Sequence, residues 1–368
     1  MMRGVNTQQE NDPTGAELLQ WYQQNRRDLP WRRTRDPYAI LVSEVMLQQT
    51  RVETVLSYYE RFLKRFPTIQ DLSAAPVEQV LGLWSGLGYY RRARLLHRAA
   101  NQIVESGGSV PRSVSELKRL PGVGAYTAAA VGSIAFDRVE PAVDGNVERV
   151  ITRLFRIAGN PRQGPARKLV EASAGKLLDP RRPGDSNQAL MELGARICRP
   201  RNPLCPLCPL ACRCQARLRG SLEEYPEKSR SRAKMTLRRQ IAVVREGGRI
   251  LLFRRPDDSP LLAGLWELPW IDGDGSSAPA KSFHGRYGGR WRVGEPYGQV
   301  QHAVTHRLFK IGVREATVQA GGFVGEGSEA GWFDSGDLTE LPMSSLVWKA
   351  LAISRPEREA SATPASGE

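Results

Sequence analysis

In the front part of the chain, apolar residues recur at three- and four-residue intervals, which is the pattern of amphipathic helices. Proline and glycine residues separate the apolar stretches, and runs typical of strands are scarce before residue 220. The pattern predicts helices over residues 16–24, 40–66, 77–83, 92–105, 125–136, 147–157 and 189–198. We therefore expect a mainly α domain here.

After residue 236 the pattern changes to short β-branched or apolar runs, which are typical of strands. The runs over 240–244 and 249–253 flank Glu246-Gly247-Gly248, which is a hairpin signal. Further strands are expected near Trp291, near Val300 and over 309–313. This part of the chain is predicted to be an α+β domain.

The composition between these two parts predicts where one domain ends and the next begins. Residues 221–236 are polar and charged and contain Pro226, as is typical of a linker. The last residues are small and polar. We predict a helical domain over 1–220, a linker over 221–236, a second domain over 237–353 and a disordered tail over 354–368.

The charge distribution indicates a class of partner. The chain has 53 Lys and Arg against 39 Asp and Glu, a net charge of +14. Residues 1–220 carry 33 basic and 20 acidic side chains, a net charge of +13. Residues 221–368 carry 20 basic and 19 acidic side chains, a net charge of +1. This asymmetry favours a polyanion as the partner of the front part, with nucleic acid ahead of a membrane surface. A basic surface that only keeps the protein soluble is the alternative.

Neither a membrane span nor a signal peptide is expected. No apolar run approaches the ~20 residues of a membrane helix, and the first thirty residues lack an apolar core. We therefore expect a cytoplasmic protein that does not bind membranes, in which cysteines are ligands or free thiols.

Four cysteines, Cys198, Cys205, Cys208 and Cys214, lie within 17 residues in the spacing C-x6-C-x2-C-x5-C. Thiols this close in a cytosolic chain are typical metal ligands. Zinc sites usually pair two short knuckles, and only one is present, so a single loop around a four-iron cluster fits the spacing better. Zinc stays open as the alternative, as does a ligand set in which Cys212 replaces Cys214.

The segment Pro121-Gly122-Val123-Gly124 follows Lys118 and Arg119 and precedes an apolar helix. This is the helix-hairpin-helix pattern, predicted here over residues 114–136. Its backbone N–H groups at Gly122 and Gly124 would bind DNA phosphate without reading the sequence, and Lys118 would add charge. A plain turn is the alternative.

Two carboxylates are candidates for acid–base chemistry. Glu44 has apolar neighbours, and a buried carboxyl group that stays protonated near neutral pH can act as a general acid. Asp144 precedes the helix expected from residue 147, so helix capping is the alternative to a catalytic role. A structural, paired carboxylate is the alternative for Glu44.

Several motifs together resemble one family. They are Ser43-Glu44-Val45-Met46-Leu47-Gln48-Gln49-Thr50, Gly86-Leu87-Gly88-Tyr89-Tyr90, Leu120-Pro121-Gly122-Val123-Gly124, Val143-Asp144-Gly145-Asn146-Val147 and the four cysteines. In this order, over about residues 15–350, the chain resembles the MutY family of adenine DNA glycosylases, in the endonuclease III or helix-hairpin-helix superfamily. The hairpin and cysteines alone are shared with the wider superfamily.

The resemblance implies roles for the carboxylates. Glu44 would protonate N7 of adenine, and ionised Asp144 would stabilise the sugar cation or add to it covalently before water completes hydrolysis. Tyr126 and Asn146 would orient Asp144 and the sugar. Bifunctional relatives have a lysine where Tyr126 stands, and no lysine lies between Arg119 and Arg149, which implies a monofunctional enzyme.

The resemblance also implies how the substrate base is held outside the duplex. The residues that match the pocket around the extruded adenine are Arg27, Leu29, Trp31, Arg32 and Glu192. Gln49 and Tyr89 match the residues that wedge into the duplex. Tyr90, next to Tyr89, is expected to pack in the core.

The second domain resembles a Nudix-like module through Gly264-Leu265-Trp266-Glu267-Leu268-Pro269. It lacks the R-E-x-x-E-E helix that holds Mg²⁺ in pyrophosphatases, so hydrolysis by this domain is not expected. In the family this domain recognises 8-oxoguanine through a Phe-Ser-His loop. Val304-Thr305-His306 occupies this place, so Thr305 and His306 are the expected recognition residues, and Val304 departs from the pattern.

The resemblance implies a monofunctional DNA glycosylase of base excision repair that removes adenine mispaired with 8-oxoguanine or guanine. It implies one [4Fe-4S] cluster and a monomer that acts on double-stranded DNA in the cytoplasm, at the nucleoid. Two alternatives stay open: a T·G mismatch thymine glycosylase, and a non-catalytic DNA-binding protein with a structural metal loop.

Overall fold

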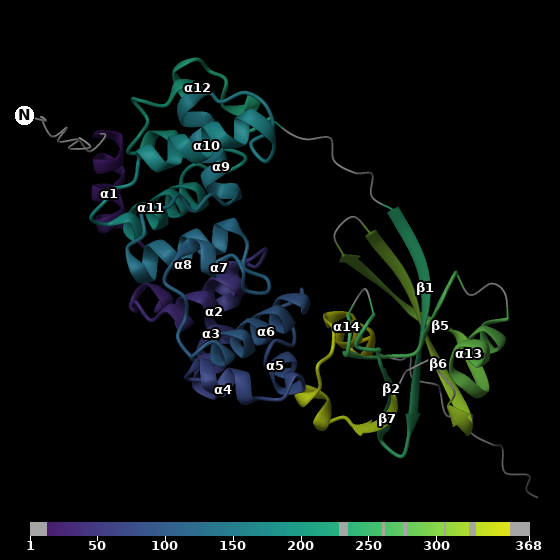
Figure 1. Cartoon of the computed structure of the whole chain (residues 1–368). Coiled ribbons are helices and arrows are strands. Elements are labelled where there is room, and N and C mark those ends of the chain that lie inside the picture. Colours follow the sequence, from purple (N-terminus) through teal and green to yellow (C-terminus); the bar gives the residue numbers. More distant parts are fainter. Residues whose placement is uncertain are drawn as a thin grey trace, which may run out of the picture. The chain divides into compact units, whose positions relative to one another are not determined.

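The computed structural model describes residues 13–227, 235–259, 262–274, 278–304, 307–323 and 329–353. The chain divides into two compact units. The first comprises the residues up to Ala75 and those from Arg94 to the linker, and the second comprises Pro76–Ala93 and the residues after the linker. Figure 1 shows helices in the first unit and a twisted sheet with α13 and α14 in the second. This confirms the predicted fold class, although the domain limits stay a prediction.

The helices before the linker have these bounds: α1 (Pro13–Asn25), α2 (Pro37–Leu47), α3 (Val52–Arg65), α4 (Ile69–Ala74), α5 (Val77–Leu83), α6 (Arg91–Glu105), α7 (Val114–Leu117), α8 (Ala125–Phe136), α9 (Gly145–Phe155), α10 (Gly164–Lys176), α11 (Pro183–Arg196) and α12 (Gln215–Leu218). Short 3₁₀ turns lie at Pro30–Arg32, Cys205–Leu207 and Leu222–Glu224. In the described residues, no helix is both long enough and apolar enough to cross a membrane.

One apolar core joins α1, α9, α10 and α11. Residues such as Leu18, Ile151, Val170 and Leu193 lie in this core and are almost completely buried. The partly buried cysteines Cys198, Cys208 and Cys214 pack against the edge of this core. The cysteine loop therefore packs against the same core as α9, the helix that Asp144 caps.

The prediction of a single helix over 40–66 is wrong in one respect, because the structure has two helices there, α2 and α3. α2 begins at the cap of Asp36, whose carboxylate accepts from the backbone N–H groups of Tyr38 and Ala39, and it ends at Leu47. Gln49 then has a left-handed backbone, with φ at 58°. α3 begins only at Val52, so the polar residues between the helices form a turn that apolar spacing alone does not reveal.

The second unit is built on a seven-stranded sheet. Its elements after the linker are β1 (Met235–Glu246), β2 (Arg249–Arg254), β3 (Trp266–Glu267), β4 (Trp270–Asp272), α13 (Pro279–Tyr287), β5 (Gly288–Val304), β6 (Arg307–Phe323), β7 (Glu329–Asp334), the 3₁₀ turn η4 (Asp337–Glu340) and α14 (Ser345–Leu351). The strand order is β3-β2-β1-β6-β5, with β4 on β1 and β7 on β2. Only the β1–β6 pair is parallel among the described strand pairs.

The alternation of residues along β1 separates two cores. Ile241 and Val243 face the core that includes Val347 of α14. Ala242 and Val244 face the core that includes Phe283 of α13. The two helices therefore cover opposite faces of the sheet, as the period of two along a strand requires.

Candidate active site

α2 carries Glu44 into the interior of the first unit. Its side chain is only 5% exposed, and no group of the described residues forms a hydrogen bond with its Oε2 atom. Burial raises the pKa of Glu44 to about 7, a hydrogen bond from Tyr126 lowers it, and the charge of Asp144 raises it. Glu44 can therefore hold a proton near neutral pH and present it.

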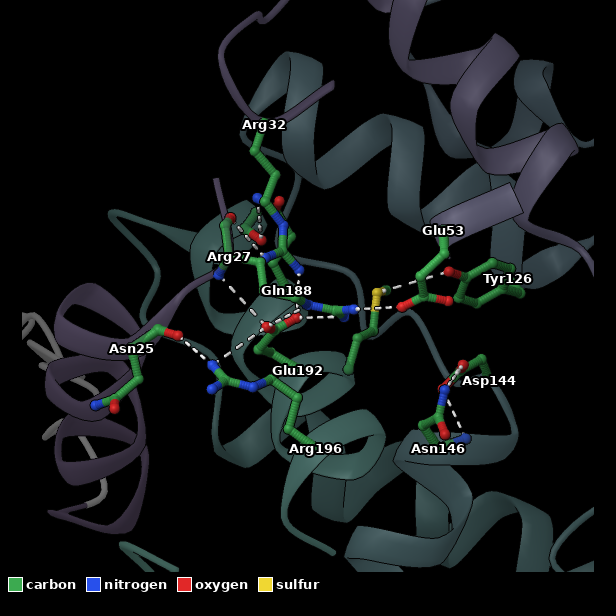
Figure 2. Close-up of polar contacts among 12 residues, drawn as sticks. Asn25, Arg27, Arg32, Glu53, Tyr126, Asp144, Asn146, Gln188, Glu192 and Arg196 are labelled. Carbon is green, nitrogen blue, oxygen red and sulfur yellow. Dashed lines mark hydrogen bonds and ion pairs between the residues drawn. The ribbon is translucent and has the colours of Figure 1, made fainter. Parts of the chain in front are cut away.

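Asp144 is the N-cap of α9 and is held by three hydrogen bonds. Its Oδ1 atom accepts from the backbone N–H groups of Asn146, at 2.9 Å, and of Val147, at 2.8 Å. Its Oδ2 atom accepts from Asn146 Nδ2 at 2.8 Å (Figure 2). Burial raises the pKa of Asp144, while these hydrogen bonds and the charge of Arg149 lower it. Asp144 is thus a helix cap, and the bonds that make it one also favour the ionised form that its predicted catalytic role requires.

Tyr126, on α8, lies close to both carboxylates. Burial raises its pKa well above the usual range, and the charges of Glu44 and Asp144 add to this effect. Its hydroxyl lies 3.6 Å from Met191 Sδ and also forms a hydrogen bond with Glu44. A phenol has one proton to donate, and a carboxylate is a stronger acceptor than a thioether, so we assign that proton to Glu44. Three helices, α2, α8 and α9, thus bring these predicted catalytic residues together.

Arg149 supports Asn146 from the next turn of α9. Its Nη2 atom donates to Asn146 Oδ1 and to the Gly194 carbonyl, each at 2.9 Å, and its Nε atom donates to the Cys198 carbonyl at 2.7 Å. A Cβ atom at Gly194 would lie 2.6 Å from Asn146 Cβ, so only glycine fits there. Sequence reasoning missed Arg149, although its position three residues after Asn146 puts both on one face of α9.

Glu192, on α11, is paired with two of the predicted pocket residues. Arg27 Nε donates to its Oε1 atom at 2.8 Å, and Arg32 Nη2 donates to its Oε2 atom at 2.8 Å (Figure 2). The Glu192 side chain is fully buried. Burial alone would raise its pKa, but the hydrogen bonds from Arg27 and Arg32 lower it overall, so the carboxylate stays ionised.

The remaining predicted pocket residues lie on the same short segment. Leu29 and Trp31 are buried, and the Trp31 ring meets the edge of Tyr59 with the ring centres 5.4 Å apart.

Sequence reasoning missed Arg196, whose Nη1 atom lies 3.7 Å from Glu192 Oε1, one turn along α11. The i, i+4 spacing of Glu192 and Arg196 is the signal that was available.

The four predicted metal ligands lie on one loop, and three of them act electrostatically on the fourth, Cys208. Burial, together with smaller contributions from the charges of Cys198, Cys214 and Cys205, raises the pKa of Cys208 to about 12. Arg153 of α9 contacts the loop: its Nη1 atom lies 3.5 Å from Cys198 Sγ. Within the described part of the chain, no three His, Cys, Asp or Glu side chains form a group that could hold a metal ion.

The hairpin places its glycines as the sequence pattern predicts. Gly122 has φ at 77°, and a Cβ atom there would lie 2.7 Å from Leu95 Cβ. Gly124 is the N-cap of α8, with an extended backbone. Gly122, Gly124 and Lys118 are all exposed, so the N–H groups at this turn are open to a ligand.

The two predicted wedge residues both have left-handed backbones. Gln49 is exposed with φ at 58°, and Tyr89 has φ at 51°. The Tyr89 ring is 47% exposed, and Tyr89 belongs to the second unit. The predicted recognition residues Thr305 and His306 lie outside the described residues.

The chain is similar to known DNA repair proteins. Residues 42–179 match the HhH-GPD superfamily of base excision DNA repair proteins, and residues 240–352 match the NUDIX domain. The chain is 43% identical over 307 residues to the adenine DNA glycosylase of Rattus norvegicus, with 69% of this chain and 59% of the relative covered. It is 40% identical over 314 residues to that of Homo sapiens, with 70% and 57% covered.

A solved structure is similar to the helical part. It is a thermostable thymine-DNA glycosylase with 33% sequence identity and a TM-score of 0.52, and the similarity covers 56% of this chain and 95% of that chain. The chain spans less than two thirds of the length of the two curated relatives above. On these similarities, the chain belongs to the HhH-GPD superfamily of base excision DNA repair proteins, and its similarity to adenine DNA glycosylases together with the NUDIX match fits the MutY family.

Proposed function

We propose that this protein is a monofunctional DNA glycosylase that hydrolyses the N-glycosidic bond of adenine mispaired with 8-oxoguanine or guanine in double-stranded DNA. The observation that carries this proposal is Glu44, a buried carboxyl group with a pKa of about 7 whose Oε2 atom has no hydrogen-bond partner among the residues that the structure describes. It lies near Asp144, a carboxylate held by three hydrogen bonds. Two carboxylates in such different surroundings suit an acid and a charge stabiliser.

In the proposed reaction, the Glu44 proton moves to N7 of the extruded adenine. The bond between the sugar C1′ and adenine N9 then breaks, and its electron pair leaves with the base. Ionised Asp144 stabilises the positive charge at C1′ or bonds to it, and water then adds at C1′ and returns a proton to Glu44. The resemblance implies that Tyr126 and Asn146 orient Asp144 and the sugar; the hydrogen bond from Tyr126 to Glu44 supports Glu44 as the group that Tyr126 orients, while Asn146 orients Asp144.

The proposed enzyme does not cleave the strand. Strand cleavage in bifunctional relatives requires an amine at the position of Tyr126. No lysine lies between Arg119 and Arg149 in this sequence, so a local amine nucleophile is missing.

The pocket for the extruded base is proposed to lie at Arg27, Arg32 and Glu192, with Leu29 and Trp31 nearby in the chain. Extrusion costs a few kcal/mol of unstacking, and Gln49 and Tyr89 are proposed to fill the space that the base leaves. The hairpin glycines and Lys118 are proposed to hold the backbone, and Thr305 and His306 to contact 8-oxoguanine.

Four partly buried thiols in one loop make up the donor set of the proposed [4Fe-4S] cluster. Burial and mutual repulsion raise the pKa of Cys208, so the thiolates need a positive group at their centre. When bound, such a cluster would offset part of the thiolate charge, and Cys198, Cys205, Cys208 and Cys214 would hold it and tie the loop together beside α9. We propose that the enzyme acts as a monomer, at the nucleoid.

A single-turnover assay on four duplexes tests the proposed function. The duplexes carry A opposite 8-oxoguanine, A opposite G, T opposite G, and A opposite T. We expect release of free adenine from the first two only, with an intact strand until alkali is added. Release of thymine from T·G would support the thymine glycosylase, and binding without release of any base would support the non-catalytic protein.

A further inference from the structure

The second unit contains a turn, residues 86–89, with an unusual backbone. Gly86, Gly88 and Tyr89 have φ at 93°, 77° and 51°, all in the left-handed region. This conformation is unfavourable for tyrosine, so the surrounding structure must hold it in place. The turn presents Tyr89, whose ring is 47% exposed.

Two side chains of the same segment hold the end of the turn. The Gly88 carbonyl accepts from Trp84 Nε1 at 3.1 Å and from Arg92 Nη2 at 3.0 Å. The Arg92 guanidinium also lies 5.5 Å from the ring centres of both Trp84 and Tyr89. These contacts fix the backbone directly before Tyr89.

Tyr90 joins the other end of the turn to the sheet-containing part of the unit. Its hydroxyl accepts from the Gly86 backbone N–H group at 3.1 Å and donates to the Met343 carbonyl at 2.5 Å. The Ser85 hydroxyl donates to the same carbonyl at 3.1 Å. Tyr90 is only 5% exposed, as core packing predicts, but its hydroxyl also links the turn to Met343.

Met343 lies in the same core as strands β5 and β6. It is fully buried in a cluster with Val300 of β5 and Phe309 of β6. Its neighbour Pro342 accepts from the Trp266 backbone N–H group at 2.9 Å, which attaches the Met343 segment to β3. The acceptor of the Tyr90 hydroxyl is therefore rigidly placed.

A second tie joins the segment to β2. Arg254 Nη2 lies 3.2 Å from Glu78 Oε1, and Glu78 is on α5, which precedes the turn. Both groups are partly exposed, so this pair adds only a weak second attachment of α5 to β2.

We propose that Tyr90 is a positioning residue whose hydroxyl fixes the 86–89 turn to the Met343 carbonyl and so orients Tyr89 for insertion into a DNA duplex. The Nudix-like part of the chain, which is proposed to read the base opposite adenine, then also determines where the inserting ring stands. This inference rests on the proposed function, because it requires Tyr89 to contact DNA.

Tyr90→Phe tests the proposal, because it keeps the ring and removes only the hydroxyl. The probe is a duplex with A opposite 8-oxoguanine and 2-aminopurine beside the adenine, whose fluorescence rises when its neighbour is unstacked. We expect Tyr90→Phe to lower the extent of unstacking by about three- to tenfold, the size of one lost hydrogen bond. In a Tyr89→Ala background, Tyr90→Phe should have no further effect.

Tyr287→Phe is the matched control. Tyr287 is a buried tyrosine of the same unit whose hydroxyl accepts from the Trp270 N–H group and donates to the Trp270 carbonyl. The Tyr287→Phe variant should unstack the probe to the same extent as the wild type. If Tyr90→Phe is unstable to heat, Ser85→Ala removes the other hydroxyl and should give a smaller loss of the same sign.

The outcomes separate this inference from the proposed function. A wild-type protein that neither unstacks the probe nor releases adenine overturns both. If the wild-type protein unstacks the probe and releases adenine, two results overturn only the positioning role. One is that Tyr90→Phe unstacks the probe as well as the wild type does. The other is that Tyr90→Phe lowers unstacking by the same factor in the Tyr89→Ala background.

Discussion

Glu44 and Asp144 are both carboxylates, yet their surroundings favour different protonation states. Burial raises the pKa of Glu44 to about 7, and its Oε2 atom has no hydrogen-bond partner in the described residues. Three hydrogen-bond donors surround Asp144 and favour its ionised form. They therefore limit the rise in its pKa that burial causes. Near neutral pH, one group can thus give a proton while the other stays ionised.

Glu44→Gln should stabilise the protein at high pH. The folded protein raises the pKa of Glu44 from 4.5 to about 7, so wild-type stability is full below about pH 4.5 and is lost as pH rises through 7. The gain in unfolding free energy of Glu44→Gln over wild type should therefore grow by roughly 3 kcal/mol between pH 4 and pH 8. Urea unfolding at both pH values measures it. Parallel pH profiles for the two proteins would contradict the raised pKa.

At the scale of elements, α9 joins the cysteine loop to the candidate active site. Asp144 caps its first turn, Arg149 contacts Asn146 and the Cys198 carbonyl, and Arg153 contacts Cys198 Sγ. One helix face therefore carries both a proposed catalytic carboxylate and the supports of the first cysteine.

Arg149→Lys should slow adenine release by about tenfold or more and leave DNA affinity within about twofold. Lysine keeps the charge but lacks the planar fork that reaches Asn146, Gly194 and Cys198 together. Single-turnover rates and a binding titration measure the two effects. Arg162→Lys is the control, because Arg162 is an exposed residue paired with Glu148, also of α9. Equal rates for Arg149→Lys and wild type would remove the positioning role of Arg149.

The hairpin makes a prediction about salt dependence. Lys118→Ala should weaken binding to any duplex and reduce the slope of log affinity against log salt by about 0.9, the value for one phosphate contact. Lys168→Ala, an equal charge change at an exposed site on α10, should leave the slope unchanged. Titrations at several salt concentrations measure this, and the same slope for both variants would argue against a phosphate contact at Lys118.

Helices with a marked apolar stretch bounded by proline or glycine could be predicted from the sequence. The helix predicted over 77–83 coincides with α5, and that over 125–136 coincides with α8. The break at Gln49 could not, because a left-handed residue leaves no apolar signal. α10 was also missed, since its small and polar residues give a weak apolar stripe. At the site, residue types identified Glu44, but the unpaired state of its Oε2 atom depends on packing between helices that are distant in sequence.

On the scale of the whole molecule, the charge of +13 lies in residues 1–220, and the later residues are nearly neutral. This division fits a helical part that holds a phosphate backbone and a Nudix-like part that inspects one base through shape and a few hydrogen bonds. The 76–93 segment departs from a simple division of the chain, because it packs with the later residues.

The metal content of the whole protein distinguishes the possible ligand sets. The purified protein should be brown and contain about four irons per chain. Cys214→Ser should lose the iron, since Cys214 packs against the core with Cys198 and Cys208, whereas Cys212→Ser should keep it, since Cys212 is exposed. Iron and zinc analysis of both variants measures this. A colourless, zinc-loaded protein would remove the cluster, and iron loss only in Cys212→Ser would reverse the ligand set.

The most direct test of the central claim is single-turnover release of adenine from a duplex with A opposite 8-oxoguanine, by the wild type and by Asp144→Asn. Asparagine can keep the capping acceptor but cannot supply a negative charge to the sugar. We predict that the wild type releases free adenine and leaves the strand intact, while Asp144→Asn binds the same duplex and releases none. Full release by Asp144→Asn, or no release by the wild type, would contradict the account.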